Sequence, residues 1–96
     1  MIKSGQLKSL ARHIGGLPNT PGVYLFKCGR EILYIGKATN LKNRVRSYFG
    51  KDLLQTRGEW LVKMMEEATR VVAQETDSVL EALILEASLI KKHQPK

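Results

Sequence analysis

The sequence predicts a small α/β domain in which a three-stranded sheet is flanked by helices. Three short runs rich in β-branched and aromatic residues predict strands, and the stretches around them space their apolar residues for helices. The length of 96 residues suits one domain with a single core. The 43% content of hydrophobic residues excludes collagen-like and disordered chains.

The chain is predicted to begin with a short helix, which we treat as an N-terminal extension (residues 1–14) of a single domain spanning 1–96. Residues 6–14 space four apolar residues for this helix, and Gly15–Gly16 ends it. Two prolines and a glycine then predict a loop over residues 17–22.

A hairpin and a turn follow the loop. The runs Val23–Lys27 and Ile32–Ile35 are rich in strand-forming residues and flank Gly29, which predicts paired strands. Gly36–Thr39 is predicted to be a turn.

Two helices are predicted after the turn. Asn40 suits the N-cap of a helix that runs to about Phe49 and ends at Gly50. Its expected buried stripe is Leu41, Val45, Tyr48 and Phe49. A second helix is predicted over residues 57–68, and its expected inward residues are Trp60, Leu61, Met64, Met65 and Ala68.

The chain ends with a third strand and a long helix. Val71–Gln74 reads as a strand. Ser78 and Glu81 have the spacing of a capping box, which predicts the start of a helix that runs to about Lys92.

Charge is distributed unevenly along the chain. Sixteen Lys and Arg against nine Asp and Glu give a net charge of +7. Residues 1–51 hold ten basic residues and one acidic residue, whereas residues 52–96 hold six basic and eight acidic ones. This concentration of positive charge favours a polyanionic partner, most often nucleic acid. A membrane surface and plain solubility are the other interpretations of that charge.

Several classes of protein are excluded by what the sequence does not carry. Its longest apolar stretch, Ala82–Leu85, is far shorter than the roughly 20 residues of a membrane span. We find no targeting segment. The single cysteine, Cys28, forms no internal disulfide and is expected at the end of a strand, which suits a cytoplasmic setting.

Glu86 has an unexpected position in the last predicted helix. At about 100° per residue, it falls on the apolar side of that helix. A buried carboxylate is costly unless it is paired or binds a metal, so Glu86 is either a metal ligand or the partner of an arginine at the edge of the core. The apolar residues around it, which we expect to face the core, are Val79, Ala82, Leu83 and Ile90.

Basic residues lie on two sides of the helix that begins at Asn40. Arg44 lies beside the buried stripe and four residues before Tyr48, so these two side chains meet on one face. A half-buried arginine suits bidentate binding of a phosphate. Lys42 and Arg46 lie on another side, as solvated charges or as non-specific contacts to a nucleic-acid backbone.

The hairpin and its turn carry two tyrosines and a lysine. On the pattern alone, Tyr24 and Tyr34 are packing residues or members of a site, and they share a sheet face only if the loop between the strands has an odd number of residues. Lys37 lies in the predicted turn, where its ammonium group could reach a phosphate. His13 and His93 have no partner pattern and are expected at the surface or the core edge.

Four blocks of the sequence occur in an order and spacing that identify a family. They are Pro21-Gly22-Val23-Tyr24, Leu33-Tyr34-Ile35-Gly36-Lys37-Ala38, the run from Leu41 to Phe49, and Leu83-Ile84-Leu85-Glu86-Ala87 with Leu89-Ile90-Lys91-Lys92. Together they resemble the GIY-YIG nuclease family, with Val23 where the family name has isoleucine. The opening Leu17-Pro18 before Pro21-Gly22 is similar to the branch formed by the N-terminal endonuclease domain of the C protein of the ABC excinuclease.

The resemblance implies a fold, a cofactor and a reaction. It implies a three-stranded antiparallel sheet and one divalent cation, Mg²⁺ or Mn²⁺, held by Glu86 and water. It also implies hydrolysis of a phosphodiester on one DNA strand, which in the excision-repair branch is the incision 3′ of the lesion. The catalytic residues that it implies are Tyr24, Tyr34, Lys37, Arg44 and Tyr48, with Gly36 and Lys37 in the turn.

These residue types suit such a reaction. A hard cation with carboxylate and water ligands stabilises charge on the phosphate and helps the leaving oxygen, and Arg44 adds a fixed positive donor. A phenol of pKa ~10 is a poor base unless cations lower that value. We favour Tyr34 as the tyrosine that contacts the attacking water, because it is next to the Lys37 turn.

The resemblance also implies partners. DNA is expected to contact Lys37, Lys42, Arg44 and Arg46. The B protein of the ABC excinuclease is expected as a partner if the chain is part of the C protein, and the chain is otherwise expected to be a monomer without a membrane partner. Two alternatives are a stand-alone or mobile-element nuclease of the same family and a non-catalytic DNA-binding module of the same fold.

Overall fold

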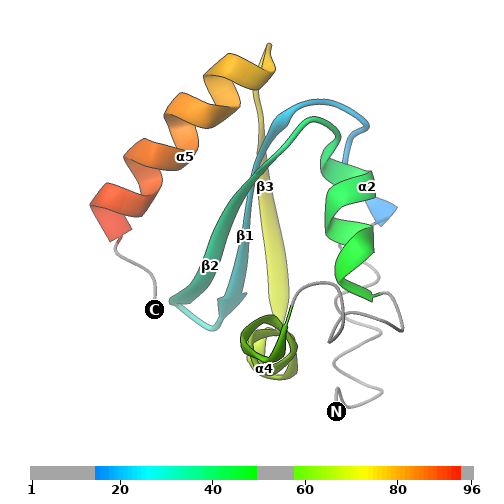
Figure 1. The fold of residues 1–96 in the computed structure, drawn as a ribbon, viewed down its shortest axis with the longest axis vertical. Coiled ribbons are helices and arrows are strands. Elements are labelled where there is room, and N and C mark those ends of the chain that lie inside the picture. The colour runs from blue at the N-terminus through cyan, green and yellow to red at the C-terminus, as the bar shows by residue number, and fades with distance from the viewer. Residues whose placement is uncertain (1–14, 50–57, 94–96) are drawn as a thin grey trace.

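The computed structural model describes residues 15–49 and 58–93 (Figure 1). Two strands come first, β1 (Gly22–Cys28) and β2 (Glu31–Ala38). The next elements are helix α2 (Leu41–Arg46), the 3-10 helix η1 (Ser47–Phe49) and helix α4 (Glu59–Glu67). Strand β3 (Arg70–Glu75) and helix α5 (Val79–His93) complete the described fold. The predicted helix over 6–14, His13 and Gly50 lie outside the described residues.

The strands form one antiparallel sheet in the order β2-β1-β3, which confirms the predicted fold class. Helix α5 covers one face of the sheet, and α2 and α4 lie on the other side (Figure 1). Under α5, Val23 and Ile35 pack against Ala82. The larger core under α2 and α4 includes Phe26 and Met65. Because β1 is the central strand, β2 lies at an edge of this sheet.

A β-bulge sets which tyrosines share a face. Only Gly29 and Arg30 separate β1 from β2, an even number for which we expected Tyr24 and Tyr34 on opposite faces. The register shifts between Phe26 and Lys27, however, so that Phe26 pairs with Tyr34 and Tyr24 pairs with Gly36. The extra residue in β2 reverses the alternation, as bulges do, and brings Tyr24 and Tyr34 to the same face. The rule based on loop length alone was therefore wrong.

The predicted turn over Gly36–Thr39 was also wrong, because β2 continues to Ala38. Gly36 and Lys37 are strand residues that pair with Tyr24 and Val23. Strand pairing with β1 extends this far because Gly36 leaves room for the Tyr24 ring, whose Cζ and Oη would lie 2.5 Å from a Cβ at that position.

Helix α2 begins as predicted and ends earlier. Asn40 is its N-cap, and its side chain accepts a hydrogen bond of 3.0 Å from the Asn43 backbone N–H. The α-helix ends at Arg46, and the remaining predicted turn is the 3-10 helix η1, which carries the buried Tyr48. Leu41 and Val45 are buried as predicted.

Helix α4 confirms the described part of the helix predicted over 57–68. Met64, Met65 and Ala68 are buried as predicted. Trp60 is not, because 50% of its surface is exposed. The two methionines fill the core beneath the helix, and Trp60, in the first turn, lies against the ring of Tyr34 instead.

Helix α5 begins with the predicted cap but turns a different side to the sheet. Ser78 Oγ accepts a hydrogen bond of 3.1 Å from the Glu81 backbone N–H, and the Glu81 carboxylate accepts one from the Asp77 backbone N–H. Ala82, Leu85 and Leu89 face the sheet, whereas the predicted core residues Val79, Leu83 and Ile90 are exposed. Apolar residues surround most of this helix, so their spacing does not define an inward side, and the small Ala82 marks the line of closest approach. No helix in the described ranges is long and apolar enough to span a bilayer.

Candidate active site

Three tyrosines converge on the face of the sheet that lies under α2. Tyr24 comes from β1, Tyr34 from β2 and Tyr48 from η1, and their ring centroids lie 5.8–6.2 Å apart. Phe26 completes this group, with its ring centroid 4.9 Å from that of Tyr48. The bulge in the hairpin and the end of α2 thus bring together residues that are 24 positions apart in the sequence.

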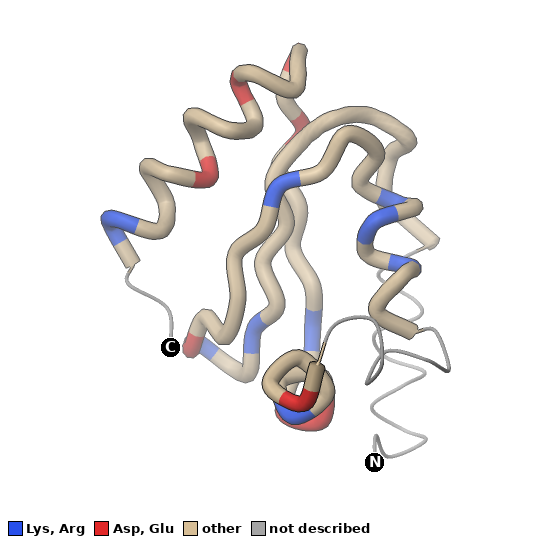
Figure 2. Tube along the Cα trace, viewed as in Figure 1, with Lys and Arg blue, Asp and Glu red and all other residues tan. Residues whose placement is uncertain are grey.

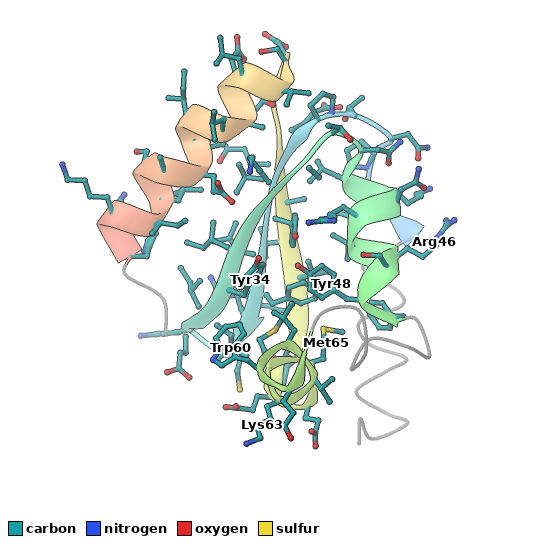
Figure 3. The ribbon with its side chains drawn as sticks, viewed as in Figure 1. Tyr34, Arg46, Tyr48, Trp60, Lys63 and Met65 are labelled. Atoms are coloured by element: carbon teal, nitrogen blue, oxygen red, sulfur yellow. The ribbon has the colours of Figure 1, made fainter. Side chains whose placement is uncertain are left out.

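The hydroxyls of Tyr24 and Tyr48 lie 2.7 Å apart and form a hydrogen bond, with each residue only 1% exposed. Gly36 makes this possible, because the end of the Tyr24 ring occupies the space that a side chain at position 36 would need. Tyr34 differs from both, since it is only half-buried. Tyr34, which lies beside Tyr48 in Figure 3, therefore presents the accessible phenol of the group, and the other two are buried.

Burial raises the pKa of Tyr48 well above the ordinary value for tyrosine, and its hydrogen bonds and charge interactions with Tyr24 and Tyr34 raise it further. Burial also raises the pKa of Tyr24, while hydrogen bonds with Tyr48 and Arg44 offset part of that rise. Both buried phenols are thus held in the neutral form at physiological pH. The interaction of Arg44 with Tyr24 ties α2 to the tyrosine group.

A carboxylate and an ammonium group face each other on the opposite side of β2. Lys37 pairs with Val23, whose side chain packs against α5, so Lys37 also points to the α5 side. Its Nζ lies 3.9 Å from Oε1 of Glu86, whose side chain is 19% exposed. This ion pair is loose, since the separation is longer than a charge-assisted hydrogen bond. Glu86 thus stands at the rim of the smaller core, with its carboxylate held near the edge of β2.

A hollow of about 440 Å³ lies between the end of β2 and helix α2. Lys37 and Arg44 line it, together with the neutral polar residues Thr39, Asn40, Asn43 and Ser47 and the apolar Ala38 and Val79. Arg46 points to the side of α2 away from Tyr34 (Figure 3). Within the described residues α2 carries basic side chains and no acidic ones, whereas α4 and α5 hold most of the acidic ones (Figure 2).

The predicted site residues thus fall into two groups that meet at the edge strand β2. Tyr34, Lys37, Arg44 and Glu86 are accessible, whereas Tyr24 and Tyr48 are buried. Arg44 is more exposed than the half-buried arginine that we predicted, because α2 ends after one and a half turns and leaves its side chain at the rim. Arg46 is not part of the group, and the exposed His93 and the strand-end Cys28 lie apart from it.

Sequence reasoning missed the polar residues of the hollow and the position of Trp60. Asn43 and Ser47 are four residues apart, so their side chains lie on one side and both line the hollow. This spacing could have identified them from the sequence. Trp60 carried no such signal, because its helical phase agrees with that of a core residue.

The side chains at the site suit a hard divalent cation that takes few of its ligands from the protein. Among the described residues no cluster of three or more carboxylate, histidine or cysteine side chains surrounds a common point. Mg²⁺ commonly keeps several waters and binds through one or two carboxylates, so a single accessible glutamate is enough. Glu86 meets this requirement, because its carboxylate is at a rim and is engaged only in a loose ion pair.

Comparisons with known proteins agree on one family. A model described as a UvrC-like GIY-YIG domain matches residues 20–96. The chain is 47% identical over 85 residues to UvrABC system protein C of Haloarcula marismortui, covering 84% of this chain and 14% of that protein. It is also 47% identical over 85 residues to the same protein of Thermus thermophilus, covering 88% and 13%. The chain thus spans about one seventh of the length of these relatives.

Solved structures of a single domain agree with this family. The crystal structure of the GIY-YIG N-terminal endonuclease domain of UvrC from Thermotoga maritima, bound to its catalytic magnesium, is similar with a TM-score of 0.77. It is 38% identical, and the match covers 99% of this chain and 97% of that one. A single Tyr-to-Phe variant of the same domain, also bound to its catalytic divalent cation, matches with a TM-score of 0.76, 39% identity and coverage of 99% and 97%.

Proposed function

The chain belongs to the family of UvrC-like GIY-YIG domains, and from this premise we propose that it is a metal-dependent DNA endonuclease domain that cuts one strand. The observation that carries the proposal is that edge strand β2 links Tyr34 with Arg44, which interacts with the tyrosine group, and with Glu86, which pairs with Lys37 of the same strand. Hydrolysis of a phosphodiester needs a proton acceptor, a cationic donor for the phosphate and a ligand for a metal. These three residues supply one of each.

Tyr34 is the residue that we propose to contact the attacking water. Its phenol is accessible, whereas the hydroxyls of Tyr24 and Tyr48 are buried and bonded to each other. Tyr24 and Tyr48 act as positioning residues, because their rings pack against Tyr34 and fix its direction. A water held at the Tyr34 hydroxyl can pass a proton to that oxygen while the hydroxyl releases its own proton to solvent, as the water oxygen bonds to phosphorus and the bond to the leaving oxygen breaks.

Arg44 and Lys37 are proposed to bind the phosphate. Both line the hollow between the end of β2 and α2, so a phosphate in it lies between a guanidinium and an ammonium group. A guanidinium can donate two hydrogen bonds to two phosphate oxygens and thus fix the orientation of the group. Asn43 and Thr39 offer neutral hydrogen-bonding groups on the same wall.

Glu86 is the residue that would hold the divalent cation, Mg²⁺ or Mn²⁺. When bound, such a cation neutralises charge on the phosphate and assists the departure of the leaving oxygen. Lys37, which is next to Glu86, stays available to the phosphate once the carboxylate has another partner.

The proposal also covers the repair pathway and the protein partner, which the longer relatives suggest. We propose that the cut is the 3′ incision of bacterial nucleotide excision repair, that the B protein of the ABC excinuclease is the protein partner, and that the chain works as a cytoplasmic monomer within one domain. The match to a UvrC-like model over residues 20–96 supports the repair branch over a mobile-element nuclease. The motif residues Tyr24, Tyr34, Lys37, Arg44, Tyr48 and Glu86 are all present, which supports an active domain over a non-catalytic DNA-binding module.

A nicking assay on supercoiled plasmid tests this function. With Mn²⁺ or Mg²⁺ the chain should convert supercoiled plasmid to the open circle, and with EDTA it should not. Open circle should form well before linear DNA, because one active site cuts one strand. Equal nicking with and without metal, or no nicking at any concentration of metal, would overturn the proposal.

A further inference from the structure

Trp60 is the only tryptophan of the chain, and it lies half exposed beside the proposed site. Its ring centroid is 5.9 Å from that of Tyr34, at an interplanar angle of 57°. Figure 3 shows Trp60 at the start of α4, close to Tyr34. Five of the six aromatic residues of the chain thus form one continuous group, which runs from the buried Phe26 to the exposed Trp60.

Trp60 is not one of the residues that form the core under α4. Met64 and Met65 already fill the core beneath α4. Trp60 instead forms one wall of a small hollow of about 150 Å³, together with Leu33, Lys63 and Met64. A large aromatic ring that is half exposed next to a catalytic phenol is more typical of a binding surface than of a core.

We propose that Trp60 is a stacking platform for an unpaired base of the DNA strand that is cut, at a nucleotide next to the bond served by Tyr34. This inference rests on the proposed function and adds the class of substrate. Aromatic side chains stack on the faces of bases that are not covered by neighbours, which is how proteins bind single strands without reading sequence.

The charges of α4 indicate that a base, and not a phosphate, meets Trp60. Helix α4 carries Glu59, Glu66 and Glu67 against one lysine, Lys63, so its surface repels the backbone of DNA. The basic residues of the hollow next to α2, Lys37 and Arg44, attract the backbone instead. A strand whose phosphates follow Lys37 and Arg44 can turn its uncharged bases toward α4.

The substrate class follows from this arrangement. Within a continuous duplex both faces of each base are covered by stacked neighbours, so no face is free for Trp60. A gap, a bubble or a single-stranded segment next to the scissile bond frees such a face. We therefore expect the domain to bind DNA with unpaired nucleotides more tightly than a duplex of the same length, by about 5- to 150-fold for one stacked base.

The test uses Trp60 itself as the probe, because no other tryptophan contributes fluorescence. The 96-residue chain is titrated in EDTA with a thymidine oligonucleotide and with a blunt duplex of equal length. Stacking should quench the emission with the oligonucleotide at concentrations where the duplex has little effect. Absence of quenching, equal quenching by both DNAs, or no DNA binding at all would overturn the proposal.

Variants separate stacking from a structural role. Binding of a labelled oligonucleotide, followed by anisotropy, should weaken about 5- to 150-fold in Trp60→Ala and much less in Trp60→Phe, which keeps an aromatic face. Ile84→Ala removes an exposed apolar side chain from α5 and is the matched control that should bind like the wild type. All three should melt within a few degrees of the wild type, because each changed side chain is at least half exposed.

Activity gives an independent readout. On a gapped substrate Trp60→Ala should raise KM and leave kcat within about two-fold, because the ring positions the strand and does not touch the bond. A loss of kcat without a change in KM would contradict this role. A chain that shows the quenching but does not nick would refute the nuclease proposal alone, and a chain that nicks without quenching would refute the stacking proposal alone.

Discussion

The hydroxyl of Tyr24 lies 2.7 Å from the hydroxyl of Tyr48, and neither ring reaches solvent to more than 1%. This contact joins the central strand to the end of α2 beneath the accessible Tyr34. The three tyrosines thus form one unit, in which the rings of the two buried residues pack against Tyr34.

Removing either buried hydroxyl should destabilise the domain. Tyr48→Phe leaves the Tyr24 hydroxyl without this partner inside the core, and the expected loss is about 1–3 kcal/mol in the free energy of unfolding. Tyr24→Phe should behave alike. The double variant should cost less than the sum of the two, because neither hydroxyl is then left behind. Urea unfolding of the four proteins measures this coupling, and strictly additive losses would count against the hydrogen bond.

Alkaline pH should destabilise the domain through the same two residues. The pKa of each is raised in the folded state, so above pH ~10 the unfolded chain releases protons that the folded chain retains. Stability is therefore full below pH ~10 and falls above it, by up to about 1.4 kcal/mol per pH unit for each tyrosine. Unfolding midpoints from about pH 8 to 11 check this. The fall should be shallower in Tyr48→Phe, and an unchanged slope would contradict the assignment.

Gly36 should not tolerate a side chain. A Cβ there would lie 2.5 Å from Cζ and Oη of Tyr24, so Gly36→Ala forces the buried ring to move. We expect a loss of about 1–3 kcal/mol, typical of overpacking, together with slower nicking. Gly15→Ala is the matched control, because nothing lies within 4 Å of a Cβ at that position. A stable and fully active Gly36→Ala protein would show that the ring is free to shift.

Two arginines of α2 should differ in their effect on DNA binding. The domain is expected to bind duplex weakly and without sequence preference, since contacts to phosphates carry no sequence information. Arg44 lines the hollow, whereas Arg46 points away from it. Arg44→Gln should lower the slope of log K against log salt by about 0.9, the value for one phosphate contact, and Arg46→Gln should leave it nearly unchanged. Equal changes in the two variants would contradict this, because they would mean that DNA also contacts the outer side of α2.

Local signals in the sequence predicted much of this fold. Asn40, Ser78 and the glycine of the hairpin marked the starts and turns of elements, and the structure has them in those roles. These signals work because a cap or a turn is decided by a few neighbouring residues. The GIY-YIG motifs then brought Tyr24, Tyr34 and Glu86 together as one group of candidates before their positions were known.

What could not be predicted depends on contacts between distant segments. The bulge opposite Phe26 and Lys27, and not the length of the loop, decides that Tyr24 and Tyr34 share a face. The inward side of α5 depends on where Ala82 meets Val23, because apolar residues occur on nearly every side of that helix. Trp60 has the phase of a core residue but is displaced from the core by the pair of methionines below it.

Direct binding of Mn²⁺ tests the role of Glu86 as the metal ligand without reference to cutting. The wild-type chain should bind one Mn²⁺, measured by electron paramagnetic resonance of the free ion, and Glu86→Gln should lose that binding while it stays folded. Glu81→Gln, on the same helix, keeps a side chain that can cap and should bind Mn²⁺ like the wild type. If Glu86→Gln binds Mn²⁺ as tightly as the wild type, the metal lies elsewhere and the account of the site is wrong.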